Sequence, residues 1–240
     1  MRRIGLVLIL MMMLAIQACV ISCDRVIDEN STVDGYKLEY EGQTTLAQTY
    51  TADTLEIESG IATIDLKGDS GSSLNLLIGY REYEPGDASI SIQDGKITTS
   101  SKSGKPVLLT SIVGTIPANL NLKVESGTGS VALAQLSQSA SVAIETGTGK
   151  VVLSDVQSKS IGIDTGTGAV NMDRCLAVSA VVNTGTGSIY MSESYIEEAE
   201  VNTGTGSLNL KNSSIERQKF VSGTGKLHQD GEYQAARILQ

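Results

Sequence analysis

Three carboxylates in this chain are spaced as a catalytic or cation-binding set would be. Glu125, Glu145 and Asp164 each stand directly before a glycine-rich phrase, about nineteen residues apart. Paired carboxylates hydrolyse glycosidic bonds, and carboxylate oxygens are preferred ligands of Ca²⁺. The same position holds Asn183 and Asn202 in later phrases, so this acidic column (Glu125, Glu145 and Asp164) loses its charge along the chain.

Alternation along the strands expected here places the acidic column on the outside. Carboxylates about 4.8 Å apart repel by only about 1 kcal/mol in water, so we expect a solvated strip. Two alternatives stay open: a strip that binds divalent cations or glycans, and the active site of a polysaccharide-active enzyme. The calcium-binding nonapeptide pattern, with Asp beside every glycine-rich turn, is not met.

The other side chains that could do chemistry stand alone. His228 is the single histidine, and Cys175 is the one cysteine beyond residue 23. Neither belongs to a cluster with metal-ligand spacing, and no G-x-S-x-G nucleophile motif is present. We therefore predict no catalytic residue, no metal and no cofactor. Cys175 is interpreted as a small buried hydrophobe.

Residues 80–87 predict a protruding loop, because Pro85-Gly86 has turn chemistry. Its Tyr80 and Tyr83 are candidates for stacking on sugars, with local packing as the alternative interpretation.

The elements that must position these residues come from a repeat. Ser/Thr-Gly-Thr-Gly occurs six times, and its first glycine recurs after 20 residues and then four times after 19. Such a period indicates a solenoid in which each repeat buries its apolar face against its neighbours. The corner glycines are Gly127, Gly147, Gly166, Gly185, Gly204 and Gly223. The threonines between the glycines are Thr128, Thr148, Thr167, Thr186, Thr205 and Thr224.

Each repeat predicts two strands that meet at a corner. Val142 and Ile144 share the inward face. Alternation carried on from Ile144 would place Val151 and Leu153 on the outside, so these two residues point inward only if the chain turns within Gly-Thr-Gly. Glycine is expected there for its access to positive φ. The inward set of the next first strands is expected to be Ile161/Ile163, Val181 and Ala199/Val201. A third, weaker side of the coil is expected at Leu136, Val156, Cys175, Ser194 and Ser213.

The pattern predicts an all-β, single-domain parallel β-solenoid (β-helix) with coils of about 19 residues, which we expect to be right-handed. The solenoid domain is expected over residues 51–240, with regular repeats from about 122 to 227 and a polar cap after them. The threonine column can pass hydroxyl hydrogen bonds from coil to coil. Ice binding by Thr-x-Thr is an alternative, but it needs both threonines on one flat outward face.

The first residues predict export. Arg2 and Arg3 precede an apolar stretch, and Val20-Ile21-Ser22-Cys23 has the pattern of a lipoprotein signal. We expect residues 1–22 to be a signal peptide, Cys23 to be lipidated (Cys19 is the alternative), and residues 23–50 to be a tether or N-terminal cap. Acyl chains would then hold the protein to a membrane. An uncut membrane helix is the other interpretation.

The net charge of the chain limits the classes of partner that we expect. Without Arg2 and Arg3, 16 basic residues stand against 27 acidic residues, a net charge of −11. Such a surface disfavours nucleic acid. The expected partners are a membrane, through the lipid anchor, and a glycan or protein ligand.

The repeat resembles a family of bacterial envelope domains called adhesin-like, or autotransporter adhesin head, domains. The resemblance covers residues 55–227 and is carried by Ile116-Pro117-Ala118-Asn119-Leu120-Asn121-Leu122 and by the repeated Ser/Thr-Gly-Thr-Gly. It implies a parallel β-solenoid and a non-catalytic structural or adhesin-like binding scaffold. Together with the leader, which places the residues after 23 outside the cytoplasm, we expect an extracytoplasmic location in a bacterial envelope, periplasmic or at the cell surface.

Overall fold

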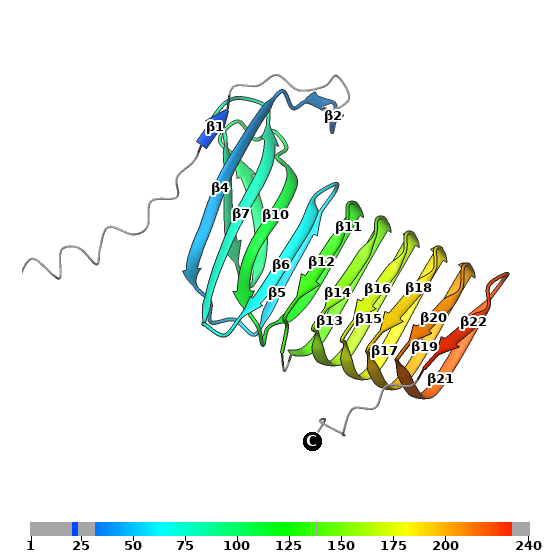
Figure 1. Ribbon diagram of the computed structural model, residues 1–240. Helices are drawn as coiled ribbons and strands as arrows, with labels where there is room; N and C mark the ends of the chain where they lie inside the picture. Colours follow the sequence, from blue (N-terminus) through cyan, green and yellow to red (C-terminus); the bar gives the residue numbers. More distant parts are fainter. Residues whose placement is uncertain (1–20, 24–31, 138, 232–240) are drawn as a thin grey trace, which may run out of the picture.

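The computed structural model describes residues 21–23, 32–137 and 139–231, and these contain strands but no helix (Figure 1). Two large sheets and one small hairpin make up the structure. The leader and Cys19 lie outside the described residues. Cys23 ends a three-residue strand. Within the described residues, no helix is long and apolar enough to cross a membrane.

The larger sheet has eleven strands. In spatial order they are β1 (Ile21–Cys23), β4 (Tyr40–Thr49), β7 (Ser73–Glu82), β10 (Leu108–Pro117), β6 (Thr63–Asp69), β12 (Val131–Ala134), β14 (Val151–Ser154), β16 (Val170–Asp173), β18 (Ile189–Ser192), β20 (Leu208–Lys211) and β22 (Leu227–Asp230).

The second sheet has nine strands. In spatial order they are β21 (Ser214–Ser222), β19 (Tyr195–Thr205), β17 (Leu176–Thr186), β15 (Gln157–Thr167), β13 (Ser139–Thr148), β11 (Asn121–Thr128), β5 (Thr54–Ser59), β9 (Lys96–Ser101) and β8 (Ala88–Gln93). The hairpin pairs β2 (Thr32–Val33) with β3 (Tyr36–Lys37).

The solenoid prediction is confirmed by the strand register. Thr148 lies beside Thr167 in a parallel pair, and Val151 lies beside Val170 in the other sheet. Each 19-residue step along the chain therefore advances one coil, so equivalent side chains stack at strand spacing. Figure 1 shows the coils from β11 to β22 as a regular row.

One coil has two strands and two corners. The long strand β15 turns at Gly166 to Gly168 into the short strand β16. The chain then turns again at Arg174, which has a φ of 49°. The equivalent residues of the other coils also have positive φ: Gln135, Asp155, Glu193, Asn212 and Gly231. The residues that follow Gln135, Asp155, Arg174, Glu193 and Asn212 are the buried third set expected from the sequence: Leu136, Val156, Cys175, Ser194 and Ser213.

The core is made of aliphatic columns between the two sheets. Val131, Val151, Val170, Ile189 and Leu208 form one column, and all five are fully buried. Burial of such a side chain stabilises the fold by roughly 1.5–3 kcal/mol. The stack therefore needs few aromatic residues.

The prediction that Val181 faces the core was wrong. Val181 is 46% exposed, whereas its neighbours Ala180 and Val182 are buried. Ala180 pairs with Ile161, and Val182 pairs with Ile163. The pairing of β17 with β15 therefore places the smaller Ala180, and not Val181, in the core.

The physical reason given for the corner glycines was also wrong. Gly166 does not have a positive φ; a Cβ there would lie 2.7 Å from the carbonyl oxygen of Gly147, in the coil before. The second glycine of the phrase is more restricted, because a Cβ on Gly168 would lie 1.9 Å from the carbonyl oxygen of Gly149. Close approach of successive coils, rather than φ, thus requires most of these glycines.

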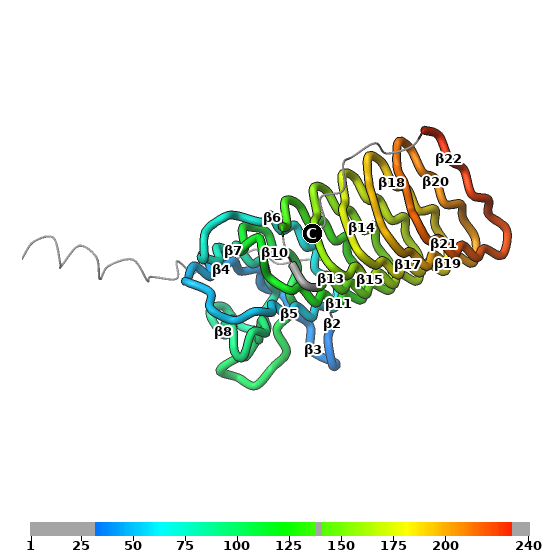
Figure 2. Tube along the Cα trace, turned by 90° about the horizontal axis from the view of Figure 1, so that it is seen from below, coloured from blue at the N-terminus to red at the C-terminus, as the bar shows by residue number. Residues whose placement is uncertain are grey.

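The N-terminal part differs from the coils. Strands β4, β7 and β10 form an antiparallel group, and β10 then joins β6 in parallel. Residues 40–49 are therefore a strand of the larger sheet. Figure 2 shows this part with β3 and β8 projecting on one side of the molecule. It covers the first edge of the solenoid, whereas β21 and β22 leave the last edge of each sheet unpaired within the described residues.

Candidate functional site

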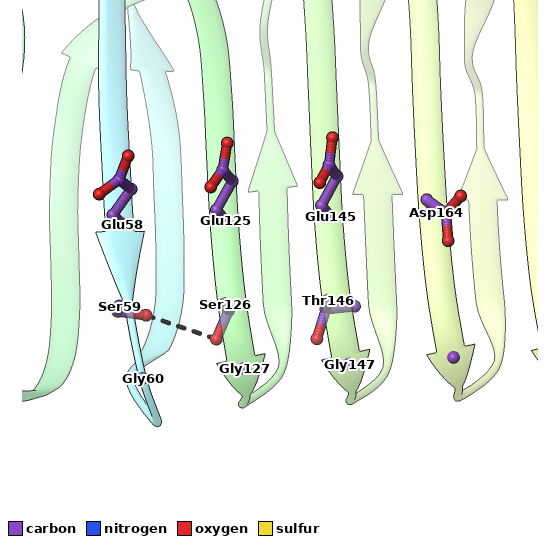
Figure 3. A pocket seen from close by; sticks show the side chains of 11 residues that line it. Glu58, Ser59, Gly60, Glu125, Ser126, Gly127, Glu145, Thr146, Gly147 and Asp164 are labelled. Atoms are coloured by element: carbon purple, nitrogen blue, oxygen red, sulfur yellow. Dashed lines mark hydrogen bonds between the residues drawn. The ribbon is translucent and has the colours of Figure 1, made fainter.

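The acidic column lines an open trough beside the first corner of the coils. The trough measures about 690 Å³. Its lining residues are Glu58, Ser59, Gly60, Glu125, Ser126, Gly127, Glu145, Thr146, Gly147, Asp164 and Gly166. Figure 3 shows Glu58, Glu125, Glu145 and Asp164 in one row, on the paired strands β5, β11, β13 and β15. Parallel stacking thus brings the three predicted carboxylates onto one outer surface.

Sequence reasoning missed the first member of this row. Glu58-Ser59-Gly60 has the same local sequence as Glu125-Ser126-Gly127, and β5 pairs with β11 in register. The signal was present in the chain. The repeat was not recognised there because Ser59-Gly60 is followed by Ile61-Ala62 in place of Thr-Gly.

Lysines pair with the carboxylates at the start of the row. Lys96 Nζ contacts both Glu58 and Glu56, and Lys123 Nζ lies 2.6 Å from Glu125 Oε1 and 3.4 Å from Glu56 Oε1. Partial burial alone would raise the pKa of Glu56, but the positive charges of Lys123 and Lys96 lower it on balance. Ligand atoms of Glu56, Glu58 and Glu125 lie within 4.8 Å of one another. The lysines already supply this cluster with positive charge.

The far end of the row becomes an amide ladder. Asn202 Nδ2 donates to Asn183 Oδ1 at 2.9 Å, and Asn183 Nδ2 lies 3.5 Å from Asp164 Oδ2. Glu145, between the two ends, is exposed. The two ends of the row are therefore paired with lysines or amides, and Glu145 between them faces solvent. No buried carboxylate faces the trough among its lining residues.

The threonine column lies on the surface, and the hydroxyl bonds between coils come from a different set. Thr148 and Thr167 are exposed. The first residue of the phrase is buried instead in five copies: Ser126, Thr146, Thr165, Thr184 and Thr203. The hydroxyl of Thr184 donates to the Gly168 carbonyl at 3.2 Å, and that of Thr203 donates to the Gly187 carbonyl at 3.2 Å, in each case in the coil before. The Thr165 hydroxyl has no hydrogen-bond partner among the described residues. One threonine of each Thr-Gly-Thr is thus inside and the other outside, which removes the flat double row that ice binding would need.

The prediction of a protruding loop at residues 80–87 was wrong for residues 80–82, which belong to strand β7. Tyr80 belongs to β7 and is only 2% exposed, with its ring packed against Gly42. Burial raises the pKa of its hydroxyl. Tyr80 therefore cannot stack on a ligand.

Tyr83 does lie at the surface, in contact with two residues that the sequence did not associate with it. Its ring meets that of Tyr36 edge to face, with centroids 5.8 Å apart. Lys105 Nζ lies 4.0 Å from the Tyr36 ring centre and 5.9 Å from that of Tyr83. We call Tyr36, Tyr83 and Lys105 the tyrosine cluster.

The two lone residues lie apart. His228 is exposed on β22. Cys175 is buried, and burial raises the pKa of its thiol to about 12. The thiol is therefore protonated at neutral pH and unsuited to nucleophilic chemistry.

Comparison with solved structures found three similar chains, of which the first shows the same fold. A protein of Bacteroides fragilis NCTC 9343 described as a "putative adhesin" is 12% identical, covers 78% of this chain and 96% of its own, and has a TM-score of 0.50. A "putative cell adhesion protein" of Clostridium sporogenes ATCC 15579 is also 12% identical, covers 79% and 100%, and has a TM-score of 0.36. A "putative adhesin" of Parabacteroides merdae ATCC 43184 is 12% identical, covers 77% and 95%, and has a TM-score of 0.33.

A search of curated proteins gave no match. Residues 29–238 match the family described as Toastrack DUF4097. Because this match spans most of the 240 residues, the chain belongs to the Toastrack DUF4097 family.

Proposed function

We propose that the protein is a non-catalytic, adhesin-like scaffold of a bacterial envelope. A lipid on Cys23 holds it to the membrane, and it presents its solenoid outside the cytoplasm. Its partners are the membrane, through that lipid, and a glycan or protein ligand. The fold shared with the Bacteroides fragilis "putative adhesin" supports this proposal.

The observation that carries the proposal is the contrast between the two faces of each strand. The inward row of the short strands is aliphatic from β12 to β20: Val131, Val151, Val170, Ile189 and Leu208. The outward row beside it changes at almost every coil: Ala132, Val152, Asn171, Tyr190, Asn209 and His228. The repeat thus preserves what closes the coils and leaves the surface free to vary, as in a scaffold.

The acidic column supports the same conclusion. Glu125 is paired with Lys123, Asp164 lies beside an Asn183 amide donor, and Glu145 is exposed. The three carboxylates thus line an open trough, where solvent reaches them.

Two experiments on cells test the location. Cells grown with a fatty-acid probe are expected to label the wild-type protein and Cys19→Ala, but not Cys23→Ala. Protease shaving of intact cells then reports whether the solenoid is at the outer surface. Unchanged labelling of Cys23→Ala would contradict the proposed anchor.

Activity assays separate the scaffold from the enzyme. Purified protein is expected to show no release of reducing sugar from a panel of polysaccharides. Turnover that disappears in Glu145→Gln or Asp164→Asn would overturn the non-catalytic assignment. Adhesion to host or bacterial cells that is lost on deletion of the gene, and restored by the wild-type chain, would support it.

A further inference from the structure

We propose that the tyrosine cluster is a binding site for neutral glycans. This inference rests on the proposed function and deepens it, because it assigns ligand binding to one place on the scaffold. The cluster joins three segments that are far apart in the sequence: the hairpin of β2 and β3, the loop after β7, and the loop before β10.

The cluster has the side chains that sugars require. Tyr36 and Tyr83 are each 36% exposed, so both rings have surface available to a ligand. A tyrosine ring offers an apolar face for the C–H groups of a pyranose and a hydroxyl for hydrogen bonds. The Lys105 ammonium lies against the rings and is a donor suited to sugar hydroxyls.

Buried carboxylates hold the loop after β7 in one shape. Glu82 is fully buried, and its two oxygens accept hydrogen bonds of 2.8 Å from the backbone amides of Gly86 and Ala88. These bonds close the turn that directly follows Tyr83. The ring is therefore carried on a loop with a fixed backbone.

A second buried carboxylate ties that loop to the one that carries Lys105. Asp87 accepts hydrogen bonds from the backbone amide and the hydroxyl of Ser103, and the Ser103 hydroxyl keeps the pKa of Asp87 below its usual range. Lys102 Nζ donates to the Gly86 carbonyl at 2.7 Å, and the Ser101 hydroxyl donates to the Lys105 carbonyl. Binding to groups already held in place loses less conformational entropy.

Charge favours a neutral ligand. The segments that form the cluster carry Lys37, Lys102 and Lys105 against Asp34, Glu39, Glu84 and Asp87, so they hold no excess of positive charge. The chain without its leader has a net charge of −11, which repels a polyanion but not a neutral oligosaccharide. Anionic glycans and anionic lipid surfaces are therefore the contrary outcomes of the test.

The test uses the chain from residue 24 onward, without its lipid, and ligand-observed NMR. The probes are cellohexaose, chitohexaose, maltohexaose and xylohexaose, with heparin and phosphatidylglycerol vesicles as anionic comparisons. At least one neutral hexasaccharide is expected to bind. Tyr83→Ala and Tyr36→Ala should weaken that binding about tenfold or more, and Lys105→Ala should weaken it as well.

Tyr190→Ala is the matched control, because Tyr190 is 50% exposed on β18, in the regular coils. Its binding is expected to equal that of wild type, and Tyr83→Phe should retain most of the affinity. Circular dichroism and thermal unfolding check that the variants fold. Binding that survives Tyr83→Ala, binding of the anionic probes alone, or no binding of any neutral probe would overturn the inference.

The two proposals fail separately. Cells that adhere normally with Tyr36→Ala/Tyr83→Ala would reject the glycan site and leave the scaffold intact. Wild-type cells that do not adhere would reject the scaffold's proposed role, whatever the purified protein binds.

Discussion

The backbone amide of Cys175 donates a hydrogen bond of 2.9 Å to the hydroxyl of Ser194, one coil later, in the interior of the solenoid. Ser194 repeats the arrangement, because its own amide donates to the Ser213 hydroxyl at 3.1 Å. The third buried column thus changes from apolar side chains to serines that satisfy the amides of the coil before. An unpaired buried amide is costly, which explains why serine is tolerated there.

Ser194→Ala should therefore destabilise the protein by about 1–3 kcal/mol, since the Cys175 amide loses its partner. Ser179→Ala is the control, because its hydroxyl lies at the surface. Urea unfolding followed by circular dichroism measures both. Equal stability of the two variants would contradict the assigned role of Ser194.

Val151→Asp and Val152→Asp test the two faces of β14. Val151 is fully buried, so a carboxylate there is left without a partner, and we expect a loss of at least about 3 kcal/mol. Val152 points outward, and Val152→Asp should change stability by less than about 1 kcal/mol. Thermal melting curves compare them; a Val151→Asp curve like that of wild type would refute the inward assignment.

Gly168→Ala tests the close approach of successive coils. The added methyl would lie 1.9 Å from the Gly149 carbonyl oxygen, so the coils must separate, at a cost of about 1–3 kcal/mol. Gly162→Ala is the matched control, because a Cβ there meets nothing within 4 Å. That variant should be neutral or more stable by about 0.5–1 kcal/mol. Chemical denaturation of both proteins gives the comparison.

Glu193 tests the second corner, where the chain adopts a positive φ of 50° without glycine. Glu193→Gly and Glu193→Ala remove the same carboxylate, but the alanine variant retains a Cβ in the left-handed region. The glycine variant should be more stable than the alanine variant by about 1 kcal/mol. The reverse order would mean that the corner does not hold this conformation in solution.

The pair of Asp155 and Arg174 should make stability depend on pH. Arg174 donates to both Asp155 oxygens, at 2.7 and 2.9 Å, and this lowers the pKa of Asp155. A carboxyl group with a lowered folded-state pKa stabilises the fold above its unfolded pKa of about 3.9, and this contribution is lost as the pH falls through the folded-state value. The difference in unfolding free energy between wild type and Asp155→Asn should be largest at pH 6–7 and vanish near pH 2. Arg174→Gln should remove the same pH dependence; a pH-independent difference would rule out this pairing.

The solenoid could be predicted from the sequence because a repeat compares the chain with itself. A residue such as Val151 recurs as Val170 and Ile189, and a position that stays aliphatic in every coil must face the interior. The acidic column followed for the same reason, since equal positions in successive coils must be neighbours. Where the local pattern was ambiguous, as at Ala180-Val181-Val182, only the register decided which side chains are buried.

Only the tertiary structure determined the contacts between segments that are not related by the 19-residue repeat. The contacts of Tyr83 with Tyr36 and Lys105, and of Lys96 with Glu56 and Glu58, join segments with no sequence repeat between them. The need for the corner glycines also depended on the coil before, because the atom that excludes a side chain at Gly166 is a carbonyl oxygen nineteen residues away. A one-dimensional period encodes which residues stack, but distances between non-repeating segments arise only when the chain has folded.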